Sequence, residues 1–346
     1  MARHLYTGDR RRRWALLAAA LTITAAIPLL LRDHGPAPAV LQVPEAAGPE
    51  KPVFYVDPQG TAAAAVRDLD RRGRHDEAAV LRRIAGQPVA SWLTDSGAAT
   101  LDRARKLVGD AARAGRVPLL VLYDIPHRDC SGRSAGGARD ATTYRKWVLD
   151  LALILRGHRA VVILEPDAVA QAVTGCLTAV RVTERYELLA AAVESLRALP
   201  GVRVYLDAGN PAWVPATEIA PALRRAGALR AHGLALNVAG FETTEDNVAY
   251  GGELSRLLGD AHFVIDTSRN GNGPARHGTG NPDPGREQWC NPPGRRLGTP
   301  PTLRTGNRLA DAYLWIKRPG ESDGACGAGA PPAGRWYPAY ALALAG

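Results

Sequence analysis

Several motifs that would define a function are missing from this chain of 346 residues. Its four cysteines come without a Cys-x-x-Cys pair or a His-rich stretch, so the spacing that a zinc site needs is absent. Neither GxxxxGK[ST] nor GxSxG occurs, which argues against a phosphate-binding loop and a serine nucleophile elbow. No nucleic-acid motif is present, and no Lys/Arg stripe interleaves with aromatic residues. The sequence predicts no metal, no cofactor and no nucleic-acid partner.

The net charge of +9 comes largely from one end of the chain. Residues 1–39 hold six arginines against Asp9 and Asp33, which gives +4, and the remaining +5 is scattered. The apolar fraction of 46% and charged fraction of 22% are ordinary for a globular protein. These values favour an enzyme-sized globular body.

The N-terminal segment has the pattern of an export signal. Arg10–Arg13 precede Trp14–Leu31, an uncharged run of eighteen residues, and Ala37-Pro38-Ala39 follows. Eighteen apolar residues are also about the minimum for a membrane span. We therefore predict that residues 1–39 are a signal peptide or an N-terminal membrane anchor and that residues 40–50 are a Pro/Ala-rich linker. The protein is expected outside the cell, either released or held to the membrane through residues 14–31.

The cysteines lie in the exported part of the chain, where an oxidising compartment favours disulfides. An even count predicts two bonds, and counting alone leaves all three possible connectivities open. The four residues are Cys130, Cys176, Cys290 and Cys326.

Short apolar runs alternate with helical stretches from residue 51 onward. This alternation is typical of βαβ units with a parallel sheet. We expect one α/β domain over residues 51–346, a distorted, TIM-like (β/α) barrel of seven or eight parallel strands. The predicted strands are Val53–Val56, Val89–Leu93, Pro118–Tyr123, Ala160–Leu164, Val202–Leu206, Gly233–Val238, His262–Ile265 and Tyr313–Ile316. The predicted helices include Leu101–Ala114, Thr142–Leu155, Thr178–Leu199, Pro215–Ala226 and Thr243–Leu258.

Carboxylates follow one predicted strand after another. In a β/α barrel the C-terminal strand ends converge on one face, so these acids should share one cleft. Crowding and burial keep one acid protonated while another stays ionised, which is what glycosidic bond cleavage requires. Each acid taken singly could instead be a helix cap or a turn residue. The acids are Asp124, Asp129, Glu165, Asp167, Asp207, Asp266, Glu321 and Asp323.

Aromatic residues near the same strand ends support a sugar substrate. Trp92 and Tyr123 lie at strand ends, and Trp213 and Trp289 lie in predicted loops. Flat rings stack on the apolar faces of pyranose rings. The alternative for each tryptophan is a structural role as a loop anchor.

Six segments, in order along the chain, together resemble the motifs of glycoside hydrolase family 6. This resemblance covers residues 53 to about 340. The segments are Leu122–Cys130 (LYDIPHRDC), Leu164–Asp167 (LEPD), Tyr205–Gly209 (YLDAG), Ile265–Pro274 (IDTSRNGNGP), Glu287–Pro292 (EQWCNP) and Trp315–Gly324 (WIKRPGESDG).

The resemblance implies a role for each matching residue. Asp167 matches the general acid, and Asp129 matches the acid that raises its pKa and helps activate water through a water chain. Asp323 matches an acid proposed as the base and held by Arg269, whereas Asp207 and Arg128 match supporting residues. Tyr123 would press on the distorted sugar at the cleavage point. Sugar-binding positions are Trp92, Trp213, Trp289, Lys317 and Glu321, and the implied disulfides are Cys130 to Cys176 and Cys290 to Cys326.

This chain departs from the family pattern at three places. Asn210 replaces a histidine that often follows the Asp-Ala-Gly motif, and Gly240-Phe241 replaces an Asn-Tyr pair, although Asn237 is kept. The serine that often positions the catalytic water falls at Ala135, with Ser134 next to it as a substitute. Asn210, Asn237 and Ser134 are therefore included among the candidate substrate-binding residues.

The expected function is an inverting β-1,4-glucanase that cleaves cellulose-type polysaccharides and acts as a monomer. Internal cleavage is expected because the segment Cys130–Tyr144 and the segment after Gly324 are short, which leaves little chain to roof the cleft. Two alternatives remain open, a surface-anchored glycan-binding homologue with little turnover and a hydrolase of another cell-wall β-glycan. Retention of Asp167, Asp129 and Asp323 argues against the first, because crowded acids repel one another and give a binding protein no advantage.

Overall fold

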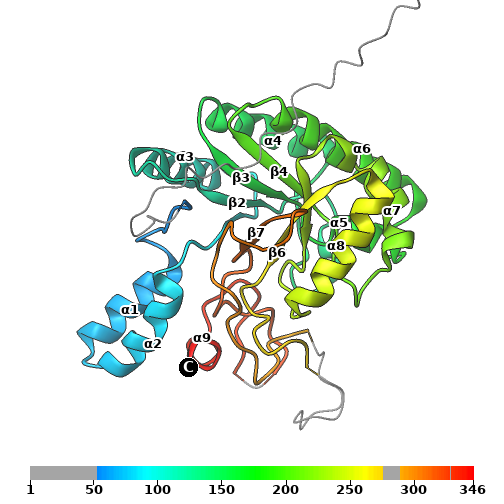
Figure 1. Cartoon of the computed structure of the whole chain (residues 1–346). Helices are drawn as coiled ribbons and strands as arrows, with labels where there is room; N and C mark the ends of the chain where they lie inside the picture. Colours follow the sequence, from blue (N-terminus) through cyan, green and yellow to red (C-terminus); the bar gives the residue numbers. More distant parts are fainter. Residues whose placement is uncertain (1–52, 276–288, 328) are drawn as a thin grey trace, which may run out of the picture. The chain divides into compact units, whose positions relative to one another are not determined.

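The computed structural model describes residues 53–275, 289–327 and 329–346 (Figure 1). The predicted signal or anchor at residues 1–39 and the linker at residues 40–50 lie outside the described residues. Among the residues that are described, every helix is too short or too polar to cross a lipid bilayer.

A parallel sheet of seven strands, in the order β1 to β7, forms the centre of the fold (Figure 1). Each strand pairs in parallel with the next one along the chain. The predicted α/β class and the distorted barrel are confirmed, with seven strands rather than eight. The strands are β1 (Ser91–Leu93), β2 (Leu119–Leu122), β3 (Ala160–Leu164), β4 (Val202–Asp207), β5 (Gly233–Leu236), β6 (His262–Asp266) and β7 (Ala310–Leu314).

The first predicted strand, Val53–Val56, is wrong as a strand. Only Phe54 forms an isolated parallel bridge, to Val117. Pro52 and Pro58 flank this run, and proline lacks the N–H that a ladder needs, so the pairing cannot extend. The last strand also begins three residues earlier than the predicted Tyr313.

The seam between β1 and β7 is nearly open. The edges of the sheet meet through one isolated parallel bridge, between Val89 and Trp315. In it the Ala90 N–H donates to the Trp315 carbonyl at 3.0 Å. The Trp92 indole N–H adds one side-chain bond across the seam, to the Ile316 carbonyl at 2.8 Å, so the barrel is distorted rather than closed by a continuous ladder.

The helices α3, α4, α6, α7 and α8 lie around the outside of the sheet (Figure 1). Local sequence explains where some of them begin: Asp140 caps α4 by accepting the Thr143 N–H, and Thr243 caps α8 by accepting the Asp246 N–H. The helices are α1 (Thr61–Arg71), α2 (His75–Ala85), α3 (Ala98–Arg113), α4 (Ala141–Leu155), α5 (Ala168–Val173), α6 (Ala179–Arg197), α7 (Ala216–Arg225), α8 (Thr244–Leu258) and α9 (Pro338–Ala345), with short 3-10 turns η1 (Asp129–Ser131) and η2 (Ala228–Arg230).

Buried side chains on the two faces of the sheet form two separate cores. On β3, Val161 and Ile163 belong to the cluster inside the barrel, whereas Val162 and Leu164 belong to the cluster beneath the helices. The alternation follows from the two-residue period of a strand. Because both faces are buried, the strand is apolar throughout, and its polar residues begin where the strand ends.

Both implied disulfides are present, Cys130 to Cys176 and Cys290 to Cys326. The first ties the loop after β2 to the end of α5. The second ties Cys290 to the loop after β7. Each therefore connects segments that follow strand ends.

Candidate active site

Acidic side chains gather at the C-terminal end of the sheet, but they do not all face the cleft. Glu165 is fully buried and accepts hydrogen bonds from the backbone N–H groups of Asp124 and Ile125, all at 3.1 Å. Asp266 accepts four backbone N–H groups, those of Ala239, Ser268, Ile316 and Lys317. These two acids brace loops, so the structural interpretation of a strand-end acid is right for them.

Asp167 stands at the start of α5 and is only partly buried. Its φ of 70° is left-handed, an unusual conformation outside glycine. The Tyr123 hydroxyl lies 3.5 Å from its Oδ2 atom. Burial, followed by the negative charge of Asp129, raises the pKa of Asp167 to about 7. The carboxyl group is thus suited to carry a proton near neutral pH.

Asp207 lies behind Asp167 and is 1% exposed. Its Oδ2 atom accepts the backbone N–H of Asp167 at 2.9 Å and that of Gly209 at 3.2 Å. Its Oδ1 atom has no hydrogen-bond partner among the described residues. Burial and the charge of Asp167 raise the pKa of Asp207 well above the usual range. Asp207 therefore contacts the backbone rather than the side chain of Asp167.

Asp129 is held at both carboxylate oxygens. The backbone N–H of Ser134 donates to Oδ2 at 2.6 Å, and the Gln171 side-chain amide donates to Oδ1 at 3.2 Å. Left-handed φ angles at His127, Asp129, Cys130 and Ser131 make this a tightly wound loop. Two donors therefore fix the orientation of this carboxylate.

Asp323 lies in a cationic setting. Arg269, which is fully buried, donates from Nη1 to both carboxylate oxygens at 2.9 and 2.8 Å, and Lys317 Nζ lies 3.1 Å from Oδ1. The Asn291 backbone N–H adds a third donor at 3.0 Å. Burial alone would raise the pKa of Asp323, but Arg269 and Lys317 outweigh it and hold this pKa below its usual value.

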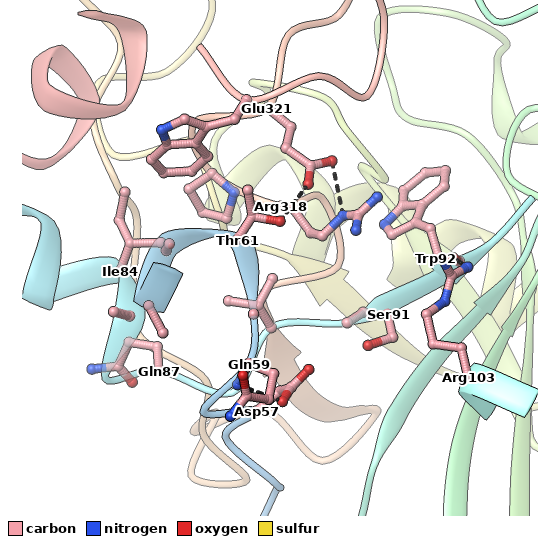
Figure 2. A pocket seen from close by; sticks show the side chains of 18 residues that line it. Asp57, Gln59, Thr61, Ile84, Gln87, Ser91, Trp92, Arg103, Arg318 and Glu321 are labelled. Carbon is pink, nitrogen blue, oxygen red and sulfur yellow. Dashed lines mark hydrogen bonds and ion pairs between the residues drawn. The ribbon is translucent and has the colours of Figure 1, made fainter. Parts of the chain in front are cut away.

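A cleft lined by Trp92, Arg318 and Glu321 opens near one end of this group, and Figure 2 shows its lining, which does not include Asp129, Asp167, Asp207 or Asp323. Trp92 stands on one side, in edge-to-face contact with Tyr123 at 5.2 Å. Glu321 is 4% exposed, with Arg318 Nε 2.9 Å from one oxygen and the Thr61 hydroxyl donating to the other at 3.3 Å (Figure 2). The carboxylate of Glu321 is thus already paired within the protein, and the guanidinium of Arg318 lies between it and Trp92.

The sequence matches the family model described as Glycosyl hydrolases family 6 over residues 50–346. The chain belongs to this family. Endoglucanase A of Thermobispora bispora is 42% identical over 318 residues, covering 89% of this chain and 64% of that protein. Endoglucanase 1 of Streptomyces halstedii is 40% identical over 301 residues, covering 84% and 88%. The solved endoglucanase Cel6 of Mycobacterium tuberculosis, in complex with a methyl-cellobiosyl-thio-cellobioside, superposes with a TM-score of 0.77 at 44% identity, covering 84% of this chain and 95% of that one.

Some of the remaining family 6 positions are exposed to solvent, whereas others are hydrogen-bonded within the protein. Trp213 and Trp289 are 37% and 51% exposed, unusual values for tryptophan. Asn210 uses its Oδ1 to accept the Ala212 N–H, which forms a turn. Asn237, in contrast, is fully buried and its side chain bonds only to backbone groups of Glu242 and Asp266, so it braces a loop.

The residues at which this chain departs from the family 6 pattern make defined contacts within the protein. Phe241 packs against the Arg269 guanidinium, whose Cζ atom lies 4.3 Å from the centre of the Phe241 ring. This contact supports the ion pair between Arg269 and Asp323. Ser134 contacts Asp129 through its backbone N–H rather than through its hydroxyl. Arg128 donates to the carbonyls of Tyr123, Thr94 and Ser134, which ties the Asp129 loop to its neighbours.

Three residues near the acids were absent from the sequence prediction. They are Gln171, Arg185 and Arg318. Two of them had a signal, since Gln171 lies four residues after Asp167 and Arg318 belongs to the motif Trp315–Gly324, three residues before Glu321.

Proposed function

We propose that this family 6 chain is an inverting endo-β-1,4-glucanase of cellulose-type polysaccharides with Asp167 as its general acid. The observation that carries the proposal is the contrast between two carboxyl groups. The pKa of Asp167 is raised to about 7, whereas that of Asp323 is held below its usual value by Arg269 and Lys317. Environments that push two pKa values apart separate a proton donor from groups that stay ionised.

Asp129 is proposed to act on the attacking water. Its carboxylate is partly exposed and is held by only two neutral donors, so it can still accept a proton from a water chain. Asp323 is the poorer base, because a guanidinium, an ammonium and a backbone N–H already occupy its oxygens. Attack by water opposite the leaving group gives inversion of the anomeric carbon.

The sugar chain is proposed to lie across the aromatic side chains that flank the acids. Tyr123 supports the unit at the cleavage point, and Trp92, Trp213 and Trp289 stack against units on either side. Asn210, Lys317 and Glu321 are proposed as the polar contacts, with Glu321 reached through its partner Arg318. We further propose an exported monomer, supported by the two disulfides.

Internal cleavage is expected to show in the viscosity of a soluble cellulose derivative. An open groove binds mid-chain, so viscosity should fall steeply while few reducing ends form. The measurement follows both quantities in one reaction, with an Asp167→Asn variant as the control for contaminating activity. Cellobiose as nearly the sole early product, with viscosity scarcely changed, would contradict the endo assignment.

The activity of the enzyme is expected to fall above about pH 7. Asp167 must be protonated to act as the acid, and its pKa of about 7 means that the proton is lost as the pH rises through this value. A profile of kcat/KM against pH should show a basic limb there. Full activity two units above this pH would mean that Asp167 is not the essential proton donor.

A further inference from the structure

We propose that Arg185, on the outer helix α6, is a positioning residue that holds the two acidic loops of the active site in register. Arg185 belongs to no motif of the resemblance and is 2% exposed. The inference rests on the proposed function only in that Asp129 and Asp167 take part in catalysis.

The contacts of the guanidinium join the loop of Asp129 to that of Asp167. Nη2 donates to the carbonyls of Pro126 and His127, just before Asp129, at 3.1 and 2.7 Å. Nη1 donates to the carbonyl of Ala168, directly after Asp167, at 3.2 Å. One rigid planar group therefore fixes the distance between two backbones that follow different strands.

A second path leads from the same guanidinium to a catalytic carboxylate. Nη1 also donates to Gln171 Oε1 at 3.3 Å. This bond orients the amide so that its Nε2 donates to Asp129 Oδ1 at 3.2 Å. Arg185 thus sets the direction of the Gln171 amide, and Gln171 in turn holds the Asp129 carboxylate.

The charge of Arg185 is also unusual in its setting. None of the ion pairs among the described residues includes it, and the four acceptors of its hydrogen bonds are neutral oxygens. A buried cation without a carboxylate partner is costly, so a purely structural clamp would be expected to be neutral. Its positive charge acts on Asp167, whose pKa it lowers against the effect of burial and of Asp129.

Other ionisable groups also surround this pair of sites. Those that interact with Asp167 or Arg185 are Asp129, Asp207, Glu165, Lys317, His127, Tyr123, Tyr144 and Tyr186. Arg185 and Lys317 are the cations of this set, so removal of Arg185 leaves Asp167 with less positive charge to oppose its raised pKa.

Two substitutions separate the charge from the geometry. Arg185→Met removes both the positive charge and the planar guanidinium that donates from Nη1 and Nη2. We therefore expect kcat to fall on the order of ten- to hundredfold. We also expect the basic limb of the kcat/KM profile to move to higher pH. Arg185→Lys keeps the positive charge but removes the planar guanidinium, so kcat should fall while the basic limb stays in place. Gln171→Leu removes both the donor to Asp129 Oδ1 and the acceptor of Arg185 Nη1, so kcat should fall while the basic limb stays in place.

Arg181→Met is the matched control, since Arg181 is exposed one turn earlier on α6. It should leave kcat and both limbs unchanged, and thermal unfolding of each variant confirms folding. If Arg185→Met and Arg185→Lys lower stability with both limbs at wild-type pH, Arg185 is merely a structural residue and the proposal is wrong. If wild-type enzyme fails to cleave β-1,4-glucan, the proposed function fails, and the limbs are then measured on the glycan that it does cleave.

Discussion

Replacement of Asp167 by asparagine is expected to lower kcat on cellulose by roughly 10²- to 10⁴-fold. The amide cannot give a proton to the departing sugar oxygen, which leaves poorly without one. Asparagine tolerates the left-handed backbone at this position, where φ is 70°, so the fold should be kept. The measurement is kcat on cellulose oligosaccharides, beside kcat on an aryl cellobioside whose leaving group needs no proton.

The comparison of the two substrates makes the assignment of Asp167 testable. The loss should be far smaller on the aryl substrate than on the oligosaccharide. Asp102→Asn, at an exposed position on α3, is the control and should change neither value. Equal losses on both substrates would show that Asp167 is needed for binding or folding rather than for proton donation.

Replacement of Arg269 by methionine is expected to cost about 3–5 kcal/mol of unfolding free energy. Arg269 is fully buried, and its removal leaves the Asp323 carboxylate in the interior with Lys317 as its remaining cation. The loss is measured by denaturant unfolding with the disulfides intact. Arg308→Met, at an exposed position, should change stability by less than about 0.5 kcal/mol.

A double variant separates the ion pair from simple loss of packing. Arg269→Met combined with Asp323→Asn should recover part of the stability, because the buried carboxylate that lost its guanidinium partner is replaced by a neutral amide, while Lys317 keeps its contact with the Ser322 carbonyl. A double variant that is less stable than Arg269→Met would contradict this explanation. It would point instead to Phe241, which loses its guanidinium contact in both variants.

The strands and outer helices could be predicted because their patterns are local. A run such as Ala160–Leu164 is apolar on both faces, and this alone indicates a buried parallel strand. The run Val53–Val56 is also made of apolar and aromatic residues, yet its flanking prolines limit it to a bridge. The helix pair α1 and α2 was not predicted, since it packs with α9 and Trp315, which are distant in sequence.

The residue types of the site could be predicted from the sequence, but which of the acids have structural roles could not. Glu165 and Asp266 follow strands just as Asp207 does, and only the fold reveals that they accept backbone N–H groups of neighbouring loops. Arg185 was missed for the opposite reason. In the sequence RVTERYE it reads as one more charged residue on a solvated helix, and the carbonyls that it contacts lie up to 59 residues away.

The seam between β1 and β7, at Val89 and Trp315, lets the adjoining edge of the cleft move more easily than the rest of the barrel. The cleft of Figure 2 is lined by Val89, Ala90, Ser91 and Trp92, so it lies along the edge where the barrel is least tightly fastened. Spreading this edge breaks the backbone bond of the Ala90 N–H and the side-chain bond from Trp92 to the Ile316 carbonyl, each at a net cost of about 0.5–1.5 kcal/mol. In a fully closed barrel, separating the same two strands would break a continuous ladder of backbone hydrogen bonds. We therefore expect the rim of this cleft to open with little distortion of the loops that hold Asp129 and Asp167.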